Sequence, residues 1–247
     1  MKKKNVAAFF DIDGTLYREG LITEVFKKMV NHEIIAKQKW IDDVRPAFMK
    51  WDRRQGEYDT YLSKMVEIFK DTTVGISKEH IEWIAKQVVE QKGERVYLFT
   101  RRELERHKRL GHLVIAISGS PLELVTEMAK KHSFDDYKGT EYKTNSKGIY
   151  TGKIVPMWDS VSKKKALHYF EKKYNLDIDQ CYSYGDTNGD ISMFSCTGHP
   201  CAVNPTRELL TNIQKDKKLK EKMRIVVERK DVIYNIDINN LNLEKKK

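Results

Sequence analysis

Two aspartates separated by one residue come directly after a short apolar segment near the N-terminus. Residues 6–10 read VAAFF, and the chain continues from position 11 as DIDGTL. Ligands bind at the carboxyl ends of strands in α/β sheets, so Asp11 is a candidate nucleophile and Asp13 a candidate general acid/base. Gly14 permits a turn there, and Thr15 offers a hydroxyl. The competing interpretation is an Asx-turn with two solvated acids.

A second polar group, SGSPLE at positions 118–123, follows the apolar segment LVIAI. The pattern predicts a helix with Ser120 as N-cap, Pro121 at its first position and Glu123 completing a capping box. The free N–H groups of such a helix start would bind an anion. Ser118 lies where its hydroxyl could donate to a phosphate oxygen. Taken alone, the segment also fits a plain strand-to-helix turn.

Two more carboxylates, Asp186 and Asp190, lie in the segment GDTNGD, which follows a weaker apolar segment. Mg²⁺ commonly takes one or two carboxylates together with waters and phosphate oxygens. The spacing loosely resembles a calcium loop, but the downstream Glu of that motif is missing. Lysines 163–165 begin a predicted helix, where they oppose its dipole. One of them could neutralise a phosphoryl group, although a solvated basic run explains the lysines equally simply.

The elements that must position these groups alternate along the chain. Short apolar runs predict strands at 6–10, 113–117, 181–184, 201–203 and 224–227. Helical patterns lie between them, at 123–132, 163–174 and 190–196. Strands that alternate with helices indicate a doubly wound, Rossmann-like α/β core.

The alternation is interrupted from about residue 21 to residue 91, where apolar residues keep a helical period. Ser77 is the expected N-cap of the last helix in this stretch, and Gly93 its end. Residues 140–153 are instead typical of a β-hairpin. The predicted organisation is a core formed by residues 1–18 and 93–247, with a small all-helical cap at 19–92 inserted after the first strand.

Composition narrows the class of protein. The chain has 247 residues with 40% hydrophobic and 33% charged side chains, which predicts a folded, charge-rich globule. Its net charge of +10 favours acidic partners. Apolar runs stay far short of the roughly 20 residues of a membrane span, so no membrane is expected. Three cysteines suit a reducing cytoplasm, and the group formed by Cys196, His199 and Cys201 lacks a fourth zinc ligand.

These motifs together resemble the haloacid dehalogenase (HAD) superfamily of phosphatases, in the phosphoserine phosphatase-like branch, subfamily IB. DIDGT resembles motif I, ISGSP resembles motif II through Ser118, and GDTNGD resembles motif IV through Asp186 and Asp190. Lys163 is the best match for the motif III lysine. The segments at 150–153 and 198–200 are also similar to this branch. The helical insert matches the family's small cap in position and type, but not clearly in sequence.

The resemblance implies a Mg²⁺-dependent hydrolysis of a small phosphate monoester. Asp11 would attack phosphorus to form an aspartyl-phosphate, while Asp13 protonates the leaving oxygen and later activates water. The implied metal ligands are Asp11, the backbone carbonyl of Asp13, and Asp186, with Asp190 supporting metal-bound waters or orienting the lysine. The phosphoryl oxygens would be bound by the following residues: Thr15, Ser118, Gly119 and Lys163. Phosphoryl transfer depends mainly on such positioning and charge neutralisation.

One position departs from the family pattern. Gly189 stands where relatives often carry Asn or Ser, and Asn188 is the adjacent residue that would have to substitute. Charged residues of the insert are candidates for recognising the leaving group, with phosphoserine as one candidate substrate; they are Glu19, Glu24, Arg45, Arg53 and Arg54.

Two alternatives stay open: a phosphotransferase that uses the same intermediate, and a non-catalytic binding protein on this fold. The expected partner is a small phosphorylated metabolite rather than nucleic acid, because no nucleic-acid module is present.

Overall fold

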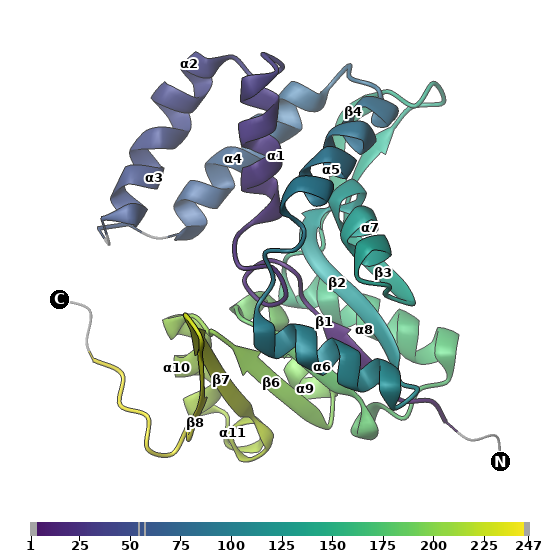
Figure 1. Ribbon diagram of the computed structural model, residues 1–247, viewed down its shortest axis with the longest axis vertical. Helices are drawn as coiled ribbons and strands as arrows, with labels where there is room; N and C mark the ends of the chain where they lie inside the picture. Colours follow the sequence, from purple (N-terminus) through teal and green to yellow (C-terminus); the bar gives the residue numbers. More distant parts are fainter. Residues whose placement is uncertain (1–3, 54, 57, 245–247) are drawn as a thin grey trace.

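The computed structural model describes residues 4–53, 55–56 and 58–244. Its centre is an eight-stranded sheet with the order β4-β3-β2-β1-β5-β6-β7-β8 (Figure 1). The strands are β1 (Ala7–Phe10), β2 (Leu113–Pro121), β3 (Asp136–Thr144), β4 (Tyr150–Val155), β5 (Tyr182–Gly185), β6 (His199–Val203), β7 (Arg224–Arg229) and β8 (Val232–Ile236). All neighbours pair in parallel except β4 and β8, which run antiparallel at the two edges. This confirms the predicted α/β class.

Helices cover both faces of the sheet. The helical elements are α1 (Leu21–Asn31), α2 (Lys37–Lys39), η1 (Trp40–Val44), α3 (Arg45–Asp52), α4 (Tyr58–Thr73), α5 (Lys78–Lys92), α6 (Leu98–Arg109), α7 (Leu122–Lys131), α8 (Ser160–Tyr174), η2 (Ile178–Gln180), η3 (Asn188–Asp190), α9 (Ile191–Cys196), α10 (Arg207–Lys215) and α11 (Lys217–Lys222). Successive strand residues point to opposite faces. Ala7 and Phe9 of β1 therefore pack with α8 and α9, whereas Ala8 and Phe10 pack with α6.

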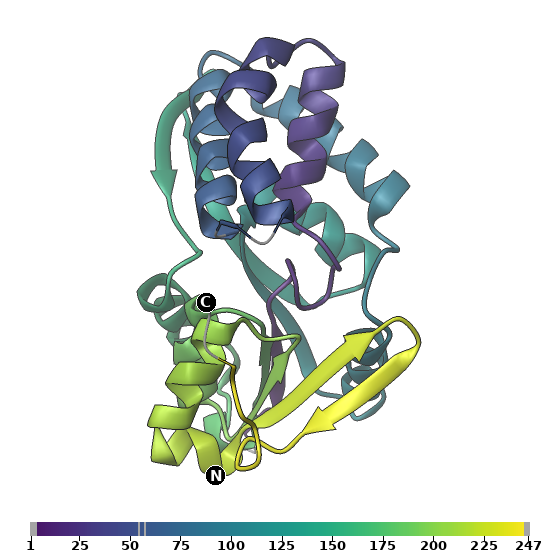
Figure 2. The same ribbon diagram turned by 90° about the vertical axis from the view of Figure 1, so that its left-hand side faces the viewer.

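The helices α1 to α5 form the predicted insert, which stands beyond the carboxyl end of β1 (Figure 2). Ser77 caps α5 by accepting a hydrogen bond from the His80 amide, and Gly93 follows the helix end, both as predicted. One hydrophobic cluster runs without a break from the insert into the core, joining Phe26 of α1 and Ile84 of α5 to Val125 of α7. The proposed boundaries of the cap, 19–92, therefore cross a shared core.

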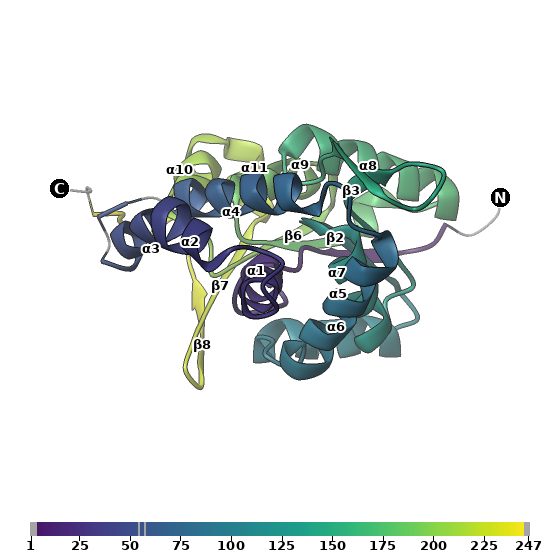
Figure 3. The same ribbon diagram turned by 90° about the horizontal axis from the view of Figure 1, so that it is seen from above.

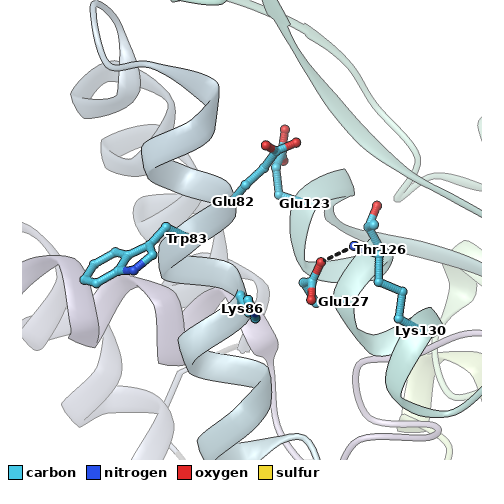
Figure 4. Close-up of a pocket in the computed structure, with 7 residues that line it drawn as sticks. All are labelled: Glu82, Trp83, Lys86, Glu123, Thr126, Glu127 and Lys130. Carbon is cyan, nitrogen blue, oxygen red and sulfur yellow. Dashed lines mark hydrogen bonds and ion pairs between the residues drawn. The ribbon is translucent and has the colours of Figure 1, made fainter.

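A groove between α5 and α7 marks the joint between insert and core (Figure 4). Glu123 of α7 is buried at this joint and accepts a hydrogen bond from the Tyr150 hydroxyl at 2.6 Å. The expected capping box is therefore wrong. The strand β2 continues to Pro121, the helix begins at Leu122 without a side-chain cap, and Ser120 bonds elsewhere. Tertiary partners for both polar side chains outweigh the local capping preference.

The β-hairpin predicted at 140–153 is present as β3 and β4. The sequence patterns missed α6, α10, α11 and the edge strand β8. The start of α6 is held by a distant group, since the buried carboxylate of Glu228 in β7 accepts from the amides of Leu98 at 3.0 Å and Phe99 at 2.7 Å. Among the described residues, no helix is both long and apolar enough to cross a bilayer.

A polar cluster is buried where α6 packs on the sheet. The His107 side chain is fully buried, with Nε2 2.9 Å from the Tyr184 hydroxyl oxygen and Nδ1 2.9 Å from Nδ1 of His112. The Tyr184 hydroxyl donates in turn to Glu103 at 2.7 Å. Burial, with help from the neighbouring charge of Arg106, lowers the pKa of His107 from 6.5 to about 3.

Because His107 stays neutral in the folded protein, we expect the free energy of unfolding to fall in acid. The unfolded chain takes up a proton near pH 6.5 and the folded chain only near pH 3, so acidification favours unfolding between these values. Lowering the pH from 7 to 5 should cost about 2 kcal/mol through this residue. Urea unfolding at both pH values should show a smaller loss for His107→Gln than for wild type. His168→Gln, at an exposed histidine of α8, is the control, and equal losses in all three proteins would contradict the prediction.

Candidate active site

A buried lysine lies between two carboxylates from distant parts of the chain. Lys163 Nζ lies 2.7 Å from Asp11 Oδ1 and 2.5 Å from Asp190 Oδ1. None of the three residues is more than 5% exposed. The Asp11 amide donates to the Tyr184 carbonyl at 2.9 Å, which continues the pairing of β1 with β5 and brings Asp11 to the loop that holds Asp186 and Asp190. Of the three consecutive lysines, 163 points inward, whereas 164 and 165 are exposed.

The charges of this group do not balance. Asp11, Asp186 and Asp190 each offer an oxygen within 4.8 Å of the others, and Lys163 is the cation that pairs with two of them. Burial and the neighbouring carboxylates raise the pKa of Asp11 to about 7, although Lys163 opposes the shift, and they raise the pKa of Asp186 as well. Burial alone would lower the pKa of Lys163, but the two carboxylates outweigh it and raise it.

With all three carboxylates ionised, one ammonium would leave two negative charges uncompensated in a largely buried site, and the raised pKa values of Asp11 and Asp186 reflect this repulsion together with burial. A divalent cation fits both this charge and the oxygen donors, which are those that Mg²⁺ prefers. Asp190 already has other partners, since its Oδ2 accepts from the amides of Asp186 and Thr187, both at 3.1 Å. Asp11 and Asp186 are therefore the side chains best placed to hold a metal, with Asp190 holding Lys163 and the loop.

The turn after β1 places Thr15 and Gly14 against Asp186. The Thr15 hydroxyl donates to Asp186 Oδ1 at 3.1 Å, and Thr15 is fully buried. Gly14 has φ of +80°, and a Cβ at this position would collide with the Asp186 carboxylate. The Gly14 amide also donates to the Tyr17 carbonyl at 2.8 Å, which closes the turn. The structure thus directs the Thr15 hydroxyl to a carboxylate, and its expected role in phosphate binding remains a prediction.

Asp13 points away from the acidic cluster, toward β2 and the insert. Its Oδ1 accepts from the amide of Leu21, the first residue of α1, at 2.6 Å. Its Oδ2 accepts from the hydroxyls of Ser120 at 2.6 Å and Ser118 at 3.3 Å. Burial raises the pKa of Asp13, although these hydrogen bonds oppose the shift. The side chain of Asp13 is therefore outside the three-carboxylate group, and the expected role of its backbone carbonyl as a metal ligand remains a prediction.

Residues 118–120, at the end of β2, are fixed from both sides. Ser118 is fully buried, and its Oγ also accepts from the Ser120 amide at 3.1 Å. The Gly119 carbonyl accepts from the Thr140 hydroxyl at 2.7 Å. The sequence did not identify Ser120 as a site residue, because its spacing to Glu123 indicated a helix cap. All eight predicted site residues nevertheless gather near the carboxyl ends of β1, β2 and β5 and the start of α8.

A steric contact explains why glycine stands at position 189, where the sequence departs from the family pattern. A Cβ at position 189 would overlap the backbone carbonyl oxygen of Trp158, in the linker between β4 and α8. Asn188 is directed elsewhere, since its Oδ1 accepts from Asn212 Nδ2 at 3.0 Å. The space that a motif IV side chain would fill is therefore taken by the Trp158 backbone.

The leaving-group candidates of the insert have different surroundings. Glu19 pairs with Arg95 at 2.6 Å, and the buried Glu24 pairs with Lys27 at 3.0 Å. Arg45 and Arg53 are exposed. Arg54 lies outside the described residues. The groove of Figure 4 is lined by none of the predicted catalytic or metal-binding residues.

Most of the chain matches one known protein family. Residues 8–195 match the model of the haloacid dehalogenase-like hydrolases, a stretch that includes all eight predicted site residues. The chain belongs to this family. The match confirms the superfamily and the hydrolase class predicted from the sequence.

Several relatives of this hydrolase are known. This chain is 23% identical over 205 residues to the "Inhibition of morphological differentiation protein" of Streptomyces azureus. The aligned stretch covers 82% of this chain and 73% of that protein. The chain is 26% identical over 196 residues to phosphoserine phosphatase SerB2 of Mycobacterium tuberculosis, covering 79% of this chain and 43% of the relative. A solved structure of phosphoserine phosphatase as a phospho-aspartyl intermediate analogue superimposes with a TM-score of 0.57 at 21% identity, covering 93% and 96%. The phosphoserine phosphatase-like arrangement of the fold is thereby confirmed.

Gly189→Ala tests the steric account of this position. The added methyl group would force the Trp158 carbonyl and the Asp190 loop apart, so we expect a loss of about 1–3 kcal/mol in the free energy of unfolding, measured in urea. Asn188→Ala in the same loop is the control, because it removes one hydrogen bond without adding volume and should cost roughly 1 kcal/mol. A Gly189→Ala protein as stable as wild type would show that the space is not restricted.

Proposed function

We propose that this hydrolase is a Mg²⁺-dependent phosphatase that hydrolyses a small phosphate monoester through an aspartyl-phosphate on Asp11. The observation that carries the proposal is the buried group in which Asp11 shares Lys163 with Asp190 and stands within 4.8 Å of Asp186. A carboxylate held in this way can face phosphorus, and the excess negative charge calls for a divalent cation. Bound metal would neutralise phosphoryl oxygens and hold the ester against Asp11.

The proposed reaction has two displacements. In the first, an Asp11 oxygen attacks phosphorus, the bond from phosphorus to the ester oxygen breaks, and Asp13 gives that oxygen its proton. In the second, Asp13 takes a proton from water, the water oxygen attacks phosphorus, and the bond to Asp11 breaks to release inorganic phosphate. Burial raises the pKa of Asp13 and so favours the protonated form that the first step requires.

The remaining side chains would bind the phosphoryl group. Lys163 brings its ammonium to Asp11, where it can also neutralise a phosphoryl oxygen. Ser118 and the Gly119 amide come from the loop that fixes Asp13, and Thr15 comes from the turn that fixes Asp186. We assign these four residues to phosphate binding.

The substrate is proposed to be a small phosphorylated metabolite of the phosphoserine type. Support comes from the relative named phosphoserine phosphatase SerB2 and from the solved phospho-aspartyl analogue of a phosphoserine phosphatase. The position of the insert also favours a small leaving group. The helix α1 begins at Leu21, whose amide donates to Asp13, so the insert lies close to where the leaving oxygen must take its proton.

Loss of the nucleophile tests the reaction. Asp11→Asn should release no inorganic phosphate from 4-nitrophenyl phosphate in Mg²⁺, while circular dichroism shows that the fold is retained. Asp13→Asn should lower the rate by about 10²–10⁴-fold, since the amide cannot transfer the proton, although it keeps one oxygen as a hydrogen-bond acceptor. The exposed Asp52→Asn is the matched control and should keep wild-type activity. A fully active Asp11→Asn protein would refute the aspartyl-phosphate.

Metal dependence is a separate test. Removal of divalent cations with a chelator should abolish phosphate release, and Mg²⁺ should restore it. Asp186→Asn removes one of the two best-placed metal ligands, so it should raise the Mg²⁺ concentration needed for half-maximal activity by at least about tenfold. Thermal unfolding with and without Mg²⁺ gives a readout independent of turnover, because a cation that binds only the folded state raises Tm. Chelator-treated enzyme with full activity would contradict the metal site.

A further inference from the structure

Two glycines allow Trp158 to lie close to the segment that is proposed to bind phosphate. A Cβ on Gly119 would lie 2.9 Å from Trp158 Cβ, and a Cβ on Gly189 would overlap the Trp158 carbonyl oxygen. These glycines come from separate segments, the last residues of β2 and the short helix η3 after β5, and each is next to a proposed site residue: Ser118 precedes the first and Asp190 follows the second. Trp158 therefore lies against both Gly119 and Gly189.

The linker on either side of Trp158 is firmly attached. The Met157 amide donates to the Thr140 hydroxyl at 3.2 Å, and this hydroxyl donates to the Gly119 carbonyl. On the other side, Asp159 caps α8 by accepting from the Ser162 amide at 2.9 Å. Lys163 follows one residue later. The position of Trp158 is thus fixed relative to both the phosphate loop and the lysine.

The side chain of Trp158 is not used in the core. It is 42% exposed, although its Cβ lies against the loop that would bind phosphate. A large apolar ring that starts beside Gly119 and stays partly open to solvent is available to contact a group attached to a phosphate bound there. Aromatic rings gain most from stacking on other flat, apolar groups.

We propose that Trp158 is a specificity-determining residue that stacks on the leaving group and favours phosphate esters of aromatic or other planar alcohols over short polar ones. This inference rests on the proposed phosphatase function. The indole contributes to binding of the ester and takes no part in proton transfer or attack, so its effect falls on KM rather than on kcat.

Steady-state kinetics in Mg²⁺ with 4-nitrophenyl phosphate and monoethyl phosphate tests this role. Trp158→Ala should raise KM for the aryl ester by about fivefold, with kcat unchanged, and leave KM for the ethyl ester unaltered. Trp158→Phe, which keeps an aromatic face, should restore most of the aryl preference. Trp83→Ala, at a tryptophan of α5 that is 48% exposed and far along the chain, is the matched control. Equal changes for both esters, or none, would overturn the proposal.

Ligand binding supplies a readout that does not need turnover. Phenylphosphonate should quench the tryptophan fluorescence of the wild-type protein more than methylphosphonate does, and the difference should vanish in Trp158→Phe but persist in Trp83→Phe. Quenching without hydrolysis of either ester would support the stacking role and refute the proposed phosphatase. Hydrolysis of both esters with no difference in KM and no selective quenching would leave the phosphatase standing and refute the stacking role.

Discussion

The site depends on one buried electrostatic arrangement, in which a single ammonium is shared between two carboxylates while a third carboxylate stands close by. Burying such charges is costly, and removing one partner of a buried pair commonly costs about 3–5 kcal/mol. The order of the sheet makes the arrangement possible, because β1 and β5 are neighbours and α8 crosses behind them. The negative charge that remains is the physical reason for expecting a divalent cation, which together with Lys163 would offset the negative charge of a phosphate ester.

Much of this arrangement could be predicted from short-range patterns. Uniformly apolar runs followed by polar residues located the ends of β1 and β5 to within one residue and the start of β2, although β2 runs four residues further than predicted. Ser77 and Gly93 correctly bounded α5. Patterns of this kind depend on residues close in sequence, where the side-chain period and the capping preference decide the outcome. The roles of the individual site residues were also inferred in this way, and they await the activity measurements.

What escaped prediction depends on distant contacts. Local physical chemistry does not distinguish Lys163 from the two lysines that follow it: only its resemblance to motif III selected it, and the packing of α8 on the sheet decides that it is the buried one. Ser120 fits a helix cap locally, yet its hydroxyl is bound by Asp13, more than a hundred positions earlier. The start of α6 is capped by Glu228 from β7, so its own sequence carries no clear start signal. Gly189 is a departure from the family pattern that only the path of the Trp158 backbone explains.

The hydrophobic cluster that runs from α1 and α5 into α7 has a consequence for how the molecule denatures. A cap joined to its core by a polar hinge can melt independently, whereas here either part alone would expose the apolar side chains that the other covers. Insert and core should therefore behave as one cooperative unit with a single calorimetric transition. Opening the whole insert as a rigid body would expose part of this cluster to water and is therefore costly.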